Sequence, residues 1–274
     1  MSLKQTVRRW ARSVNWFLFT VLDLQLIRRS QAEHADVFGT LRRLISGNET
    51  VIVDVGARRG GTVFSLHGLF PDARIDCFEP STESFQLLQE RFRSVPGIRC
   101  NHMAVAESSG IVKLHLSRTD ATNSLLNADP EFAVSVDPRH VEVVGEEEVT
   151  AVSLDDYCSQ EAIDQVRLLK IDIQGGELMA LRGAQRLLAA GKIDTILTEV
   201  CFARLYEGQG LFWDIRDHVE RHGYRLYGLY DLRHGRNGML AWGDALFVSP
   251  QLVERLNQLW AGSQTGDHVA IPAS

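Results

Sequence analysis

The sequence is poor in cysteine, and its four cysteines lie far apart without a C-x-x-C motif. This spacing argues against a zinc knuckle or a thioredoxin-like pair. Cys77 and Cys201 fall in apolar runs, where a free thiol behaves as a small hydrophobic group. A reducing compartment fits this usage, and we therefore predict a cytoplasmic protein.

Several short motifs of catalysis and nucleotide binding are also absent. There is no G-x-S-x-G elbow, no Walker G-x-x-x-x-G-K-[ST] and no G-x-G-x-x-G, which argues against a hydrolase, a nucleotide-hydrolysing protein and a dinucleotide site. With 29 basic and 35 acidic residues the chain carries a net charge of −6, so nucleic acid is not expected as the partner. Hydrophobic residues at 45% and charged residues at 23% are typical of a folded globular chain of this length, 274 residues.

The N-terminal segment differs from the rest of the chain. Residues 1–30 carry six basic side chains and one acidic side chain. A membrane-spanning helix needs about 20 apolar residues, and the uncharged run 13–22 has only half that length. Aromatic and apolar residues recur there at helical spacing, at Trp10, Val14, Trp16, Phe17, Leu18 and Val21. A helix on the surface of an anionic membrane would fit this pattern. The alternative is a helix packed on the main domain or on a second subunit, which would make a homo-oligomer.

From residue 36 onward, helical and strand-like patterns alternate. The strands are expected at 51–55, 74–78, 98–105, 166–173, 195–200, 224–230 and 245–248, and the helices at 37–45, from Pro80 and Ser81 through Phe92, at 177–190 and at 212–219. An antiparallel insert or a substrate-covering loop is expected over 110–152, with the acidic run 146–148 as a solvated turn. This alternation predicts an α/β fold, a mostly parallel sheet covered on both faces. We divide the chain into a helical extension (1–46), a main domain (47–250) and a C-terminal helix with a loose tail (251–274).

Ligands of open parallel sheets bind beyond the carboxyl ends of the strands, so the residues after each strand are informative. Gly56 and Gly60 follow the first strand and would let the backbone turn tightly and approach a ligand. Glu79 ends the second strand, where a carboxylate can accept hydrogen bonds from both ribose hydroxyls. After the third strand, Met103 or Ala104 could form a wall for an adenine ring.

A second group of acids follows later strands. Asp172 ends one strand in the motif KIDIQGGE, and Glu199 ends the next. Two carboxylates at adjacent strand ends could act as general bases, bind the charged tail of a cofactor or hold a divalent cation. Helix capping, or pairing with Lys170 or Arg204, is the structural alternative. His218 and His222 stand four apart on a predicted helix, but a helix-end position explains His222, and we assign the pair no catalytic role.

In sequence order these motifs resemble the FkbM family of S-adenosylmethionine-dependent methyltransferases. The resemblance runs from about residue 50 to 249 through VIVDVGARRGGTVFS, DCFEPSTESFQLL, NHMAVAESSG, VTAVSLDDY, VRLLKIDIQGGELMALRGA, ILTEVCFARLYEG and DALFVSP. It implies a Rossmann-like class I methyltransferase fold, with seven strands and the final strand antiparallel between its neighbours. It also implies S-adenosylmethionine as cofactor and a hydroxyl oxygen as methyl acceptor, on a sugar, a glycan, a glycolipid or a natural product.

The resemblance also implies which residues form the site. Cofactor binding is expected at Asp54, Gly56, Ala57, Gly60, Glu79, Pro80, Ala104 and Asp172, and Asp172 and Glu199 are the candidates for the base or for ligands of a cation; no metal site is otherwise indicated. The family usually has asparagine where this chain has Arg58, and a cation there would face the sulfonium unless it pairs with the cofactor carboxylate or turns away. The alternatives are a nicotinamide-dependent oxidoreductase, which the glycine spacing and the lack of a well-placed Tyr-x-x-x-Lys pair disfavour, and a non-catalytic cofactor-binding protein.

Overall fold

The computed structural model describes residues 36–45, 50–129 and 142–264. The chain divides into two compact units, Met1–Leu44 and Ile45–Ser274. Of the first unit only α3 (Val37–Leu44) is described as an element, and the Asp36 carboxylate caps it by accepting hydrogen bonds from the Phe38 and Gly39 amides, each at 3.0 Å. The membrane-surface helix expected within 1–30 lies outside the described residues.

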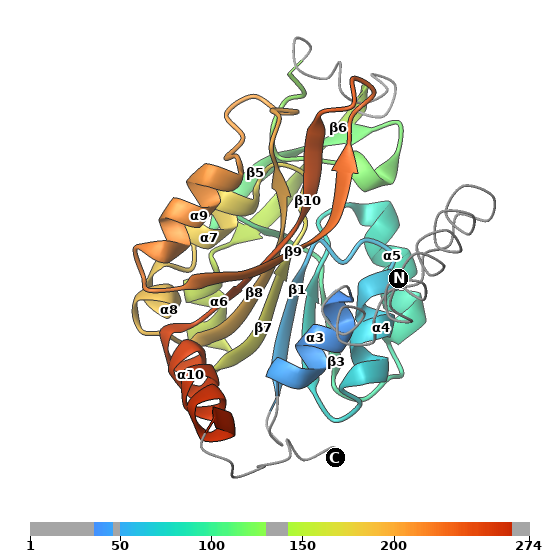
Figure 1. The fold of residues 1–274 in the computed structure, drawn as a ribbon. Coiled ribbons are helices and arrows are strands. Elements are labelled where there is room, and N and C mark those ends of the chain that lie inside the picture. The colour runs from blue at the N-terminus through green and yellow to red at the C-terminus, as the bar shows by residue number, and fades with distance from the viewer. Residues whose placement is uncertain (1–35, 46–49, 130–141, 265–274) are drawn as a thin grey trace, which may run out of the picture. The chain divides into compact units, whose positions relative to one another are not determined.

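The second unit is built on a seven-stranded sheet with the order β3-β2-β1-β7-β8-β10-β9 (Figure 1). Its strands are β1 (Val51–Val55), β2 (Arg74–Phe78), β3 (Ile98–Asn101), β7 (Val166–Ile171), β8 (Ile193–Cys201), β9 (Arg225–His234) and β10 (Leu240–Val248). The five strands from β3 to β8 pair in parallel, whereas β10 runs antiparallel to both β8 and β9. The predicted mostly parallel sheet, with its final strand antiparallel between two neighbours, is confirmed.

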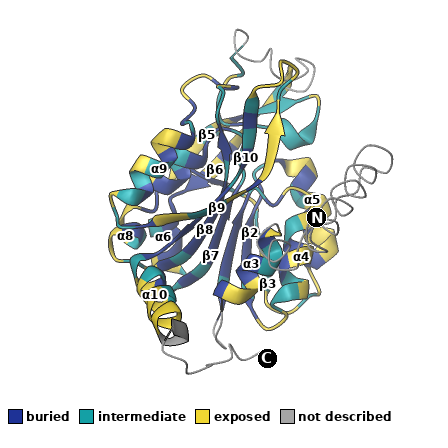
Figure 2. Cartoon of the chain, in the orientation of Figure 1, coloured by how far each residue is buried: buried dark blue, intermediate teal, exposed yellow. Residues whose placement is uncertain are grey.

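Helices cover both faces of this sheet, as predicted. They are α4 (Gly61–Leu69), α5 (Thr82–Phe92), α6 (Leu154–Gln160), α7 (Glu177–Arg182), α8 (Gln185–Ala189), α9 (Phe212–Glu220) and α10 (Pro250–Gln264). Figure 1 shows α4 and α5 on one side and α7, α8 and α9 on the other. On the latter side, side chains of α6 to α9 form one hydrophobic core with the sheet. Figure 2 shows the central strands β2, β7 and β8 as a buried layer, whereas the edge strand β9 is largely exposed.

A smaller sheet interrupts the main alternation where the insert was predicted. It has the order β4-β6-β5 and consists of β4 (Ala104–Val105), β5 (Gly110–Ser117) and β6 (Val143–Val152), with the 3₁₀-helix η1 (Asp120–Thr122) after β5. Two expectations need correction here. The segment 98–105, expected as one strand, forms two strands in different sheets. Its first part, β3, pairs with β2 in the large sheet, and its second part, β4, pairs with β6 in the small sheet. The acidic run 146–148 is not a turn but part of β6, paired with residues 113–115 of β5.

Two further segments differ from expectation. The helix expected over 177–190 is divided into α7 and α8, with Gly183 and Ala184 between them; a β-carbon on Gly183 would lie 2.2 Å from the Ala106 oxygen. The tail expected to be loose from residue 261 continues α10 as far as Gln264, and its remainder lies outside the described residues. Within the described ranges, no helix combines the length and apolarity that crossing a membrane requires.

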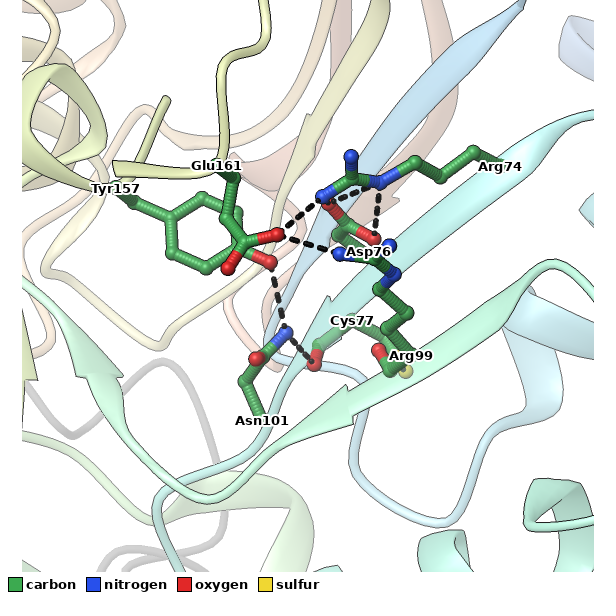
Figure 3. A network of polar contacts seen from close by, with 7 residues as sticks. All are labelled: Arg74, Asp76, Cys77, Arg99, Asn101, Tyr157 and Glu161. Atoms are coloured by element: carbon green, nitrogen blue, oxygen red, sulfur yellow. Dashed lines mark hydrogen bonds and ion pairs between the residues drawn. The ribbon is translucent and has the colours of Figure 1, made fainter. Parts of the chain in front are cut away.

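A polar network joins α6 and the residue after it to β2 and β3 (Figure 3). Arg74 forms ion pairs with the fully buried Asp76 at 2.7 Å and with Glu161 at 2.9 Å. Asn101 donates hydrogen bonds to the Cys77 oxygen at 3.2 Å and to the Tyr157 hydroxyl at 3.3 Å. The buried charge of Asp76 is thereby paired, as burial demands, and the ends of β2 and β3 are held together.

Candidate active site

The carboxyl ends of β1, β2 and β7 border a cavity of about 640 Å³, a size typical of cofactor and small-molecule sites. Strand order reverses between β1 and β7, the place where open α/β sheets bind ligands. Six of the predicted residues line this cavity, namely Gly56, Ala57, Glu79, Pro80, Ala104 and Asp172. Asp54, Gly60 and Glu199 are adjacent to lining residues but do not line the cavity themselves.

Gly56 brings two loops of the cavity together. Its φ is +82°, and a β-carbon there would lie 1.9 Å from the backbone oxygen of Asp172. Only glycine allows this approach between the loops after β1 and β7. The Gly56 and Ala57 amides both donate to the Phe78 oxygen, at 3.0 and 2.9 Å, which fixes the same loop to the end of β2.

Gly60 serves a different contact. Its φ is +80°, and a β-carbon would lie 2.2 Å from Cε2 of Phe92 and 2.9 Å from Cδ1 of Leu88. Both of these side chains belong to α5. The close approach expected of the Gly60 backbone is therefore an approach to a helix of the protein, and it lets α4 begin against α5.

Glu79 presents a carboxylate at the cavity wall that already has two donors. The Arg58 amide donates to Oε2 at 2.8 Å, and the Ser81 amide donates to Oε1 at 2.9 Å. Burial raises the pKa of Glu79 to about 7, although these two donors act in the opposite direction. Each carboxylate oxygen has a second lone pair, so the group can accept two further hydrogen bonds from a ligand diol.

Lys170 neutralises the acids beside it. Its ammonium group lies 3.1 Å from Oδ1 of Asp54 and 3.8 Å from Oδ2 of Asp172, and it donates to the Gly56 oxygen at 3.3 Å. Burial alone would lower the pKa of Lys170, but the two aspartates outweigh it and raise the pKa. Asp54 is completely buried, and burial raises the pKa of its carboxyl group while Lys170 opposes the rise. Asp54 therefore binds Lys170 from inside the protein and does not line the cavity.

Arg58 and Arg59 both turn toward the insert and bind Asp120 of η1. Arg58 pairs with Oδ1 of Asp120, and the Arg59 Nε lies 2.7 Å from Oδ2. The hydrogen bond from Arg58 lowers the pKa of Asp120. The unusual cation at position 58 is therefore paired with a carboxylate from the insert, and the insert is tied to the glycine loop.

A hydrogen-bonded group lies where β7 and β8 end. The Gln174 side-chain amide donates to Oδ1 of Asp172 at 3.1 Å and to Oε2 of Glu199 at 3.0 Å. The Tyr206 hydroxyl donates to the Gln174 side-chain oxygen at 3.2 Å. The predicted acids Asp172 and Glu199 are thus brought together, but through Gln174, and of the two only Asp172 reaches the cavity.

Burial sets the ionisation of the other acids in this group. It raises the pKa of Glu199 well above its ordinary value, with Asp172 adding to the effect, and it raises the pKa of Asp244 on β10 to about 6. Burial also raises the pKa of Glu177 to about 7. Glu177 accepts hydrogen bonds from the Ile173 and Gly175 amides at 2.9 and 3.2 Å, so it holds the loop before α7. Asp172, 42% exposed at its side chain, is the carboxylate among these that a ligand can reach.

The sequence analysis missed several residues of this site. Arg59, Arg91, Asp120, Asn123, Ser124, Leu125 and Gln174 line the cavity, and Tyr206 supports it. Gln174 lies within the KIDIQGGE motif, and its polar side chain two residues after Asp172 could have indicated that it belongs to the site. The insert residues carry no such signal, because their place over the cavity depends on the pairing of β5 with β6.

The histidine pair is part of the packing of α9. The His218 and His222 rings lie 5.7 Å apart, and burial lowers the pKa of His218. Across the described part of the chain, no three His, Cys, Asp or Glu side chains are arranged to hold a metal ion.

Comparisons with known proteins agree with this geometry. The family model for the methyltransferase FkbM domain matches residues 54–226. The 2-O-methyltransferase NoeI of Sinorhizobium fredii is 25% identical over 215 residues, 76% of this chain and 81% of that protein. Methyltransferase 1 of Beauveria bassiana is 24% identical over 189 residues, 65% of this chain and 74% of that protein.

Among solved structures, the precorrin-6y C5,15-methyltransferase of Geobacter metallireducens aligns with a TM-score of 0.41 at 12% identity, over 81% of this chain and 90% of that one. The family model covers more than half of the present sequence and includes the glycine loop, Glu79 and the Asp172 motif. The chain belongs to the FkbM family of S-adenosylmethionine-dependent methyltransferases.

Proposed function

We propose that this protein is an O-methyltransferase that transfers the methyl group of S-adenosylmethionine to a hydroxyl group of a sugar, a glycan, a glycolipid or a natural product. One observation carries the proposal. Gly56 after β1, Glu79 after β2 and Asp172 after β7 border the same cavity of about 640 Å³. The carboxylate that can accept hydrogen bonds from a ribose and the candidate base therefore belong to one site.

The residues present fit the cofactor. Glu79 has two donors on its protein side and lone pairs left for the ribose hydroxyls. The Gly56–Ala57 turn and Pro80 would border the remainder of the nucleoside, with Ala104, Met103 and Leu125 as its apolar wall. When bound, S-adenosylmethionine supplies a methyl group on a sulfonium, and an oxygen nucleophile takes that methyl group while the carbon–sulfur electron pair stays on sulfur.

Asp172 supports the choice of oxygen as the acceptor atom. A hydroxyl group is a poor nucleophile until its proton has a place to go, and a positioned carboxylate can accept that proton. Asp172 lines the cavity, where its carboxylate accepts a hydrogen bond from Gln174 and faces Lys170. Holding acceptor and base in one cavity contributes to the rate by proximity, worth up to about 7 to 11 kcal/mol in well-oriented intramolecular systems.

The relative NoeI, named a 2-O-methyltransferase, supports a hydroxyl acceptor. The lining agrees with a polar acceptor, since Asn123 and Ser124 place hydrogen-bonding groups on the insert side of the cavity. These groups can bind hydroxyls of a saccharide or a similarly oxygenated product.

Isothermal titration with S-adenosylhomocysteine tests the cofactor half of the proposal. We expect one site per chain, and weaker binding by Glu79→Gln. The exposed Glu83→Gln, on the first turn of α5, is the matched control and should bind as the unchanged protein does. Folded protein that does not bind S-adenosylhomocysteine would contradict the proposal.

Turnover tests the second half and separates an enzyme from a non-catalytic binding protein. Labelled S-adenosylmethionine is incubated with a pool of sugars and glycosides, and the label is expected in a methyl ether. Asp172→Asn should bind S-adenosylhomocysteine but transfer the methyl group slowly. Label on nitrogen or carbon of the product would replace the O-methyl proposal, and binding without any transfer to a broad acceptor pool would favour the non-catalytic alternative.

A further inference from the structure

Gln174 occupies an unusual backbone position next to the candidate base. Its φ is +54°, a left-handed conformation that costs free energy for a residue with a β-carbon. The Ser124 hydroxyl donates to the Gln174 main-chain oxygen at 2.6 Å, and Glu177 accepts from the amides on either side of it, at Ile173 and Gly175. The surrounding structure thus holds this residue in a conformation that it would not adopt unaided.

The orientation of the Gln174 amide is determined by its neighbours. Its nitrogen faces the carboxylates of Asp172 and Glu199, and its oxygen accepts from the buried Tyr206 hydroxyl. The reverse orientation would place the amide oxygen against the Asp172 carboxylate and lose the hydrogen bond to it. Asp172 therefore selects the orientation in which the amide donates to it, and the Tyr206 hydroxyl holds the oxygen end of the same amide.

The two oxygens of Asp172 have different partners within the protein. Oδ1 accepts from Gln174 at 3.1 Å, and Oδ2 faces the Lys170 ammonium at 3.8 Å. Lys170 is shared with Asp54, to which it lies closer, at 3.1 Å. The hydrogen bond from Gln174 is thus the shorter of the two contacts that orient the Asp172 carboxylate.

We infer that Gln174 is a positioning residue, which holds the carboxylate of Asp172 toward the methyl acceptor and is itself fixed by Tyr206 and Ser124. The inference rests on the proposed function, since it assigns Asp172 the acceptor's proton. It also connects the insert to the base, because Ser124 belongs to the segment that follows η1. Glu199 accepts a second hydrogen bond from the same amide and so helps to hold Gln174 in place.

Substitution of Gln174 by methionine keeps the length of the side chain and removes its donors. Crystal structures of the unchanged protein and of Gln174→Met, each with S-adenosylhomocysteine, should show the Asp172 carboxylate displaced by about 1 Å or more in the variant. A shift of this size is enough to cost about a hundredfold in rate. Tyr206→Phe removes only the hydroxyl that holds the amide oxygen, and it should produce a smaller displacement in a protein whose ring packing is retained.

Kinetics on a mixture of methyl hexopyranosides adds a readout that a purely structural role would not give. We expect kcat to fall tenfold to about a hundredfold in Gln174→Met, with KM and the affinity for S-adenosylhomocysteine unchanged. Gln185→Met, at an exposed position of α8, is the matched control and should leave every measurement unchanged. An Asp172 carboxylate that stays in place in both variants would overturn the inference while leaving the proposed function intact. Failure of the unchanged protein to bind S-adenosylhomocysteine would overturn the proposed function and the inference with it.

Discussion

The main-chain oxygen of Asp172 occupies the space that a side chain at Gly56 would need, 1.9 Å from the ideal β-carbon position. The turn after β1 and the turn after β7 are therefore in direct contact at the cavity. Both turns also carry site residues, since Ala57 follows one and Gln174 the other. A substitution that displaces one of these turns should consequently displace the other.

Gly56→Ala is expected to displace the Asp172 loop and to weaken S-adenosylhomocysteine binding by at least about tenfold, with a loss of stability of a few kcal/mol from the overlap and the positive φ. Calorimetric titration and chemical denaturation measure the two effects. Gly68→Ala is the control, because no atom lies within 4 Å of a β-carbon at this exposed helical position. It should be neutral or stabilising by about 1 kcal/mol. Equal behaviour of the two variants would show that the contact is unimportant.

Cofactor affinity should depend on pH through Glu79. Its pKa in the folded protein is about 7, so the carboxylate that we propose as the acceptor of hydrogen bonds from the ribose becomes fully available only above neutrality. The affinity for S-adenosylhomocysteine should therefore rise about tenfold between pH 6 and 8, with release of a proton on binding at the lower pH. Titration in buffers of different ionisation enthalpy measures that proton. Glu79→Gln should bind more weakly and without this dependence; a variant that kept the pH dependence would point to another group.

Stability should fall as pH rises through the titration of Glu177. Its pKa is raised from 4.5 to about 7 on folding, so between these values the folded state binds more protons than the unfolded chain and unfolding becomes easier with increasing pH. Glu177→Gln keeps an oxygen for the Ile173 and Gly175 amides but carries no charge. It should raise the free energy of unfolding at pH 8 by about 2 kcal/mol and have little effect at pH 4. Denaturation at several pH values checks this, and an unchanged slope in the variant would refute the assignment.

Asp120 should hold the start of the insert loop to the glycine loop. Asp120→Asn removes the charge that pairs with Arg58 and Arg59, and charge-assisted hydrogen bonds are worth about 1.5 to 3 kcal/mol. Amide hydrogen exchange in a peptide spanning 117–126 should then become about tenfold faster. Asp217→Asn, in the exposed pair with Arg216 on α9, should leave this exchange unchanged. Equal exchange in both variants would mean that Asp120 does not anchor the segment.

The sequence was sufficient for the features that depend on local pattern. Short apolar runs predicted β1 and β2 with their observed bounds, and Ser81 marked the start of α5. Because both strands are parallel members of one sheet, the residues after them had to share an edge, and Gly56 and Glu79 could be assigned to one cavity.

Features that depend on distant partners could not be predicted in this way. The Asp155 carboxylate accepts hydrogen bonds from the Arg186 and Leu187 amides at 2.7 and 3.0 Å, so the first turn of α8 is capped by a residue about 30 positions earlier. The acids of β6 lie in a strand because β6 pairs with β5, whose Lys113 lies 2.8 Å from Glu146. Neither partner is visible in the pattern of the segment it stabilises.

The site follows the same division. Asp172 and Glu199 were found because they end strands, but the Gln174 amide between them depends on a left-handed residue that no periodicity indicates. The pairing of Arg58 with Asp120 depends on the path of the insert, and the sequence left open whether this cation paired or turned away.

The contact between Gly60 and Phe92 shows that a glycine of the loop can be required by packing within the protein and not by a ligand. Gly60 is required by an aromatic ring of the protein itself, and Gly56 by a neighbouring peptide group, so selection for folding alone would preserve both glycines. A variant that lacked Asp172 would still need both glycines. The glycine pattern therefore reports on the packing of the loop, whereas the proposed activity has to be judged from Glu79 and Asp172.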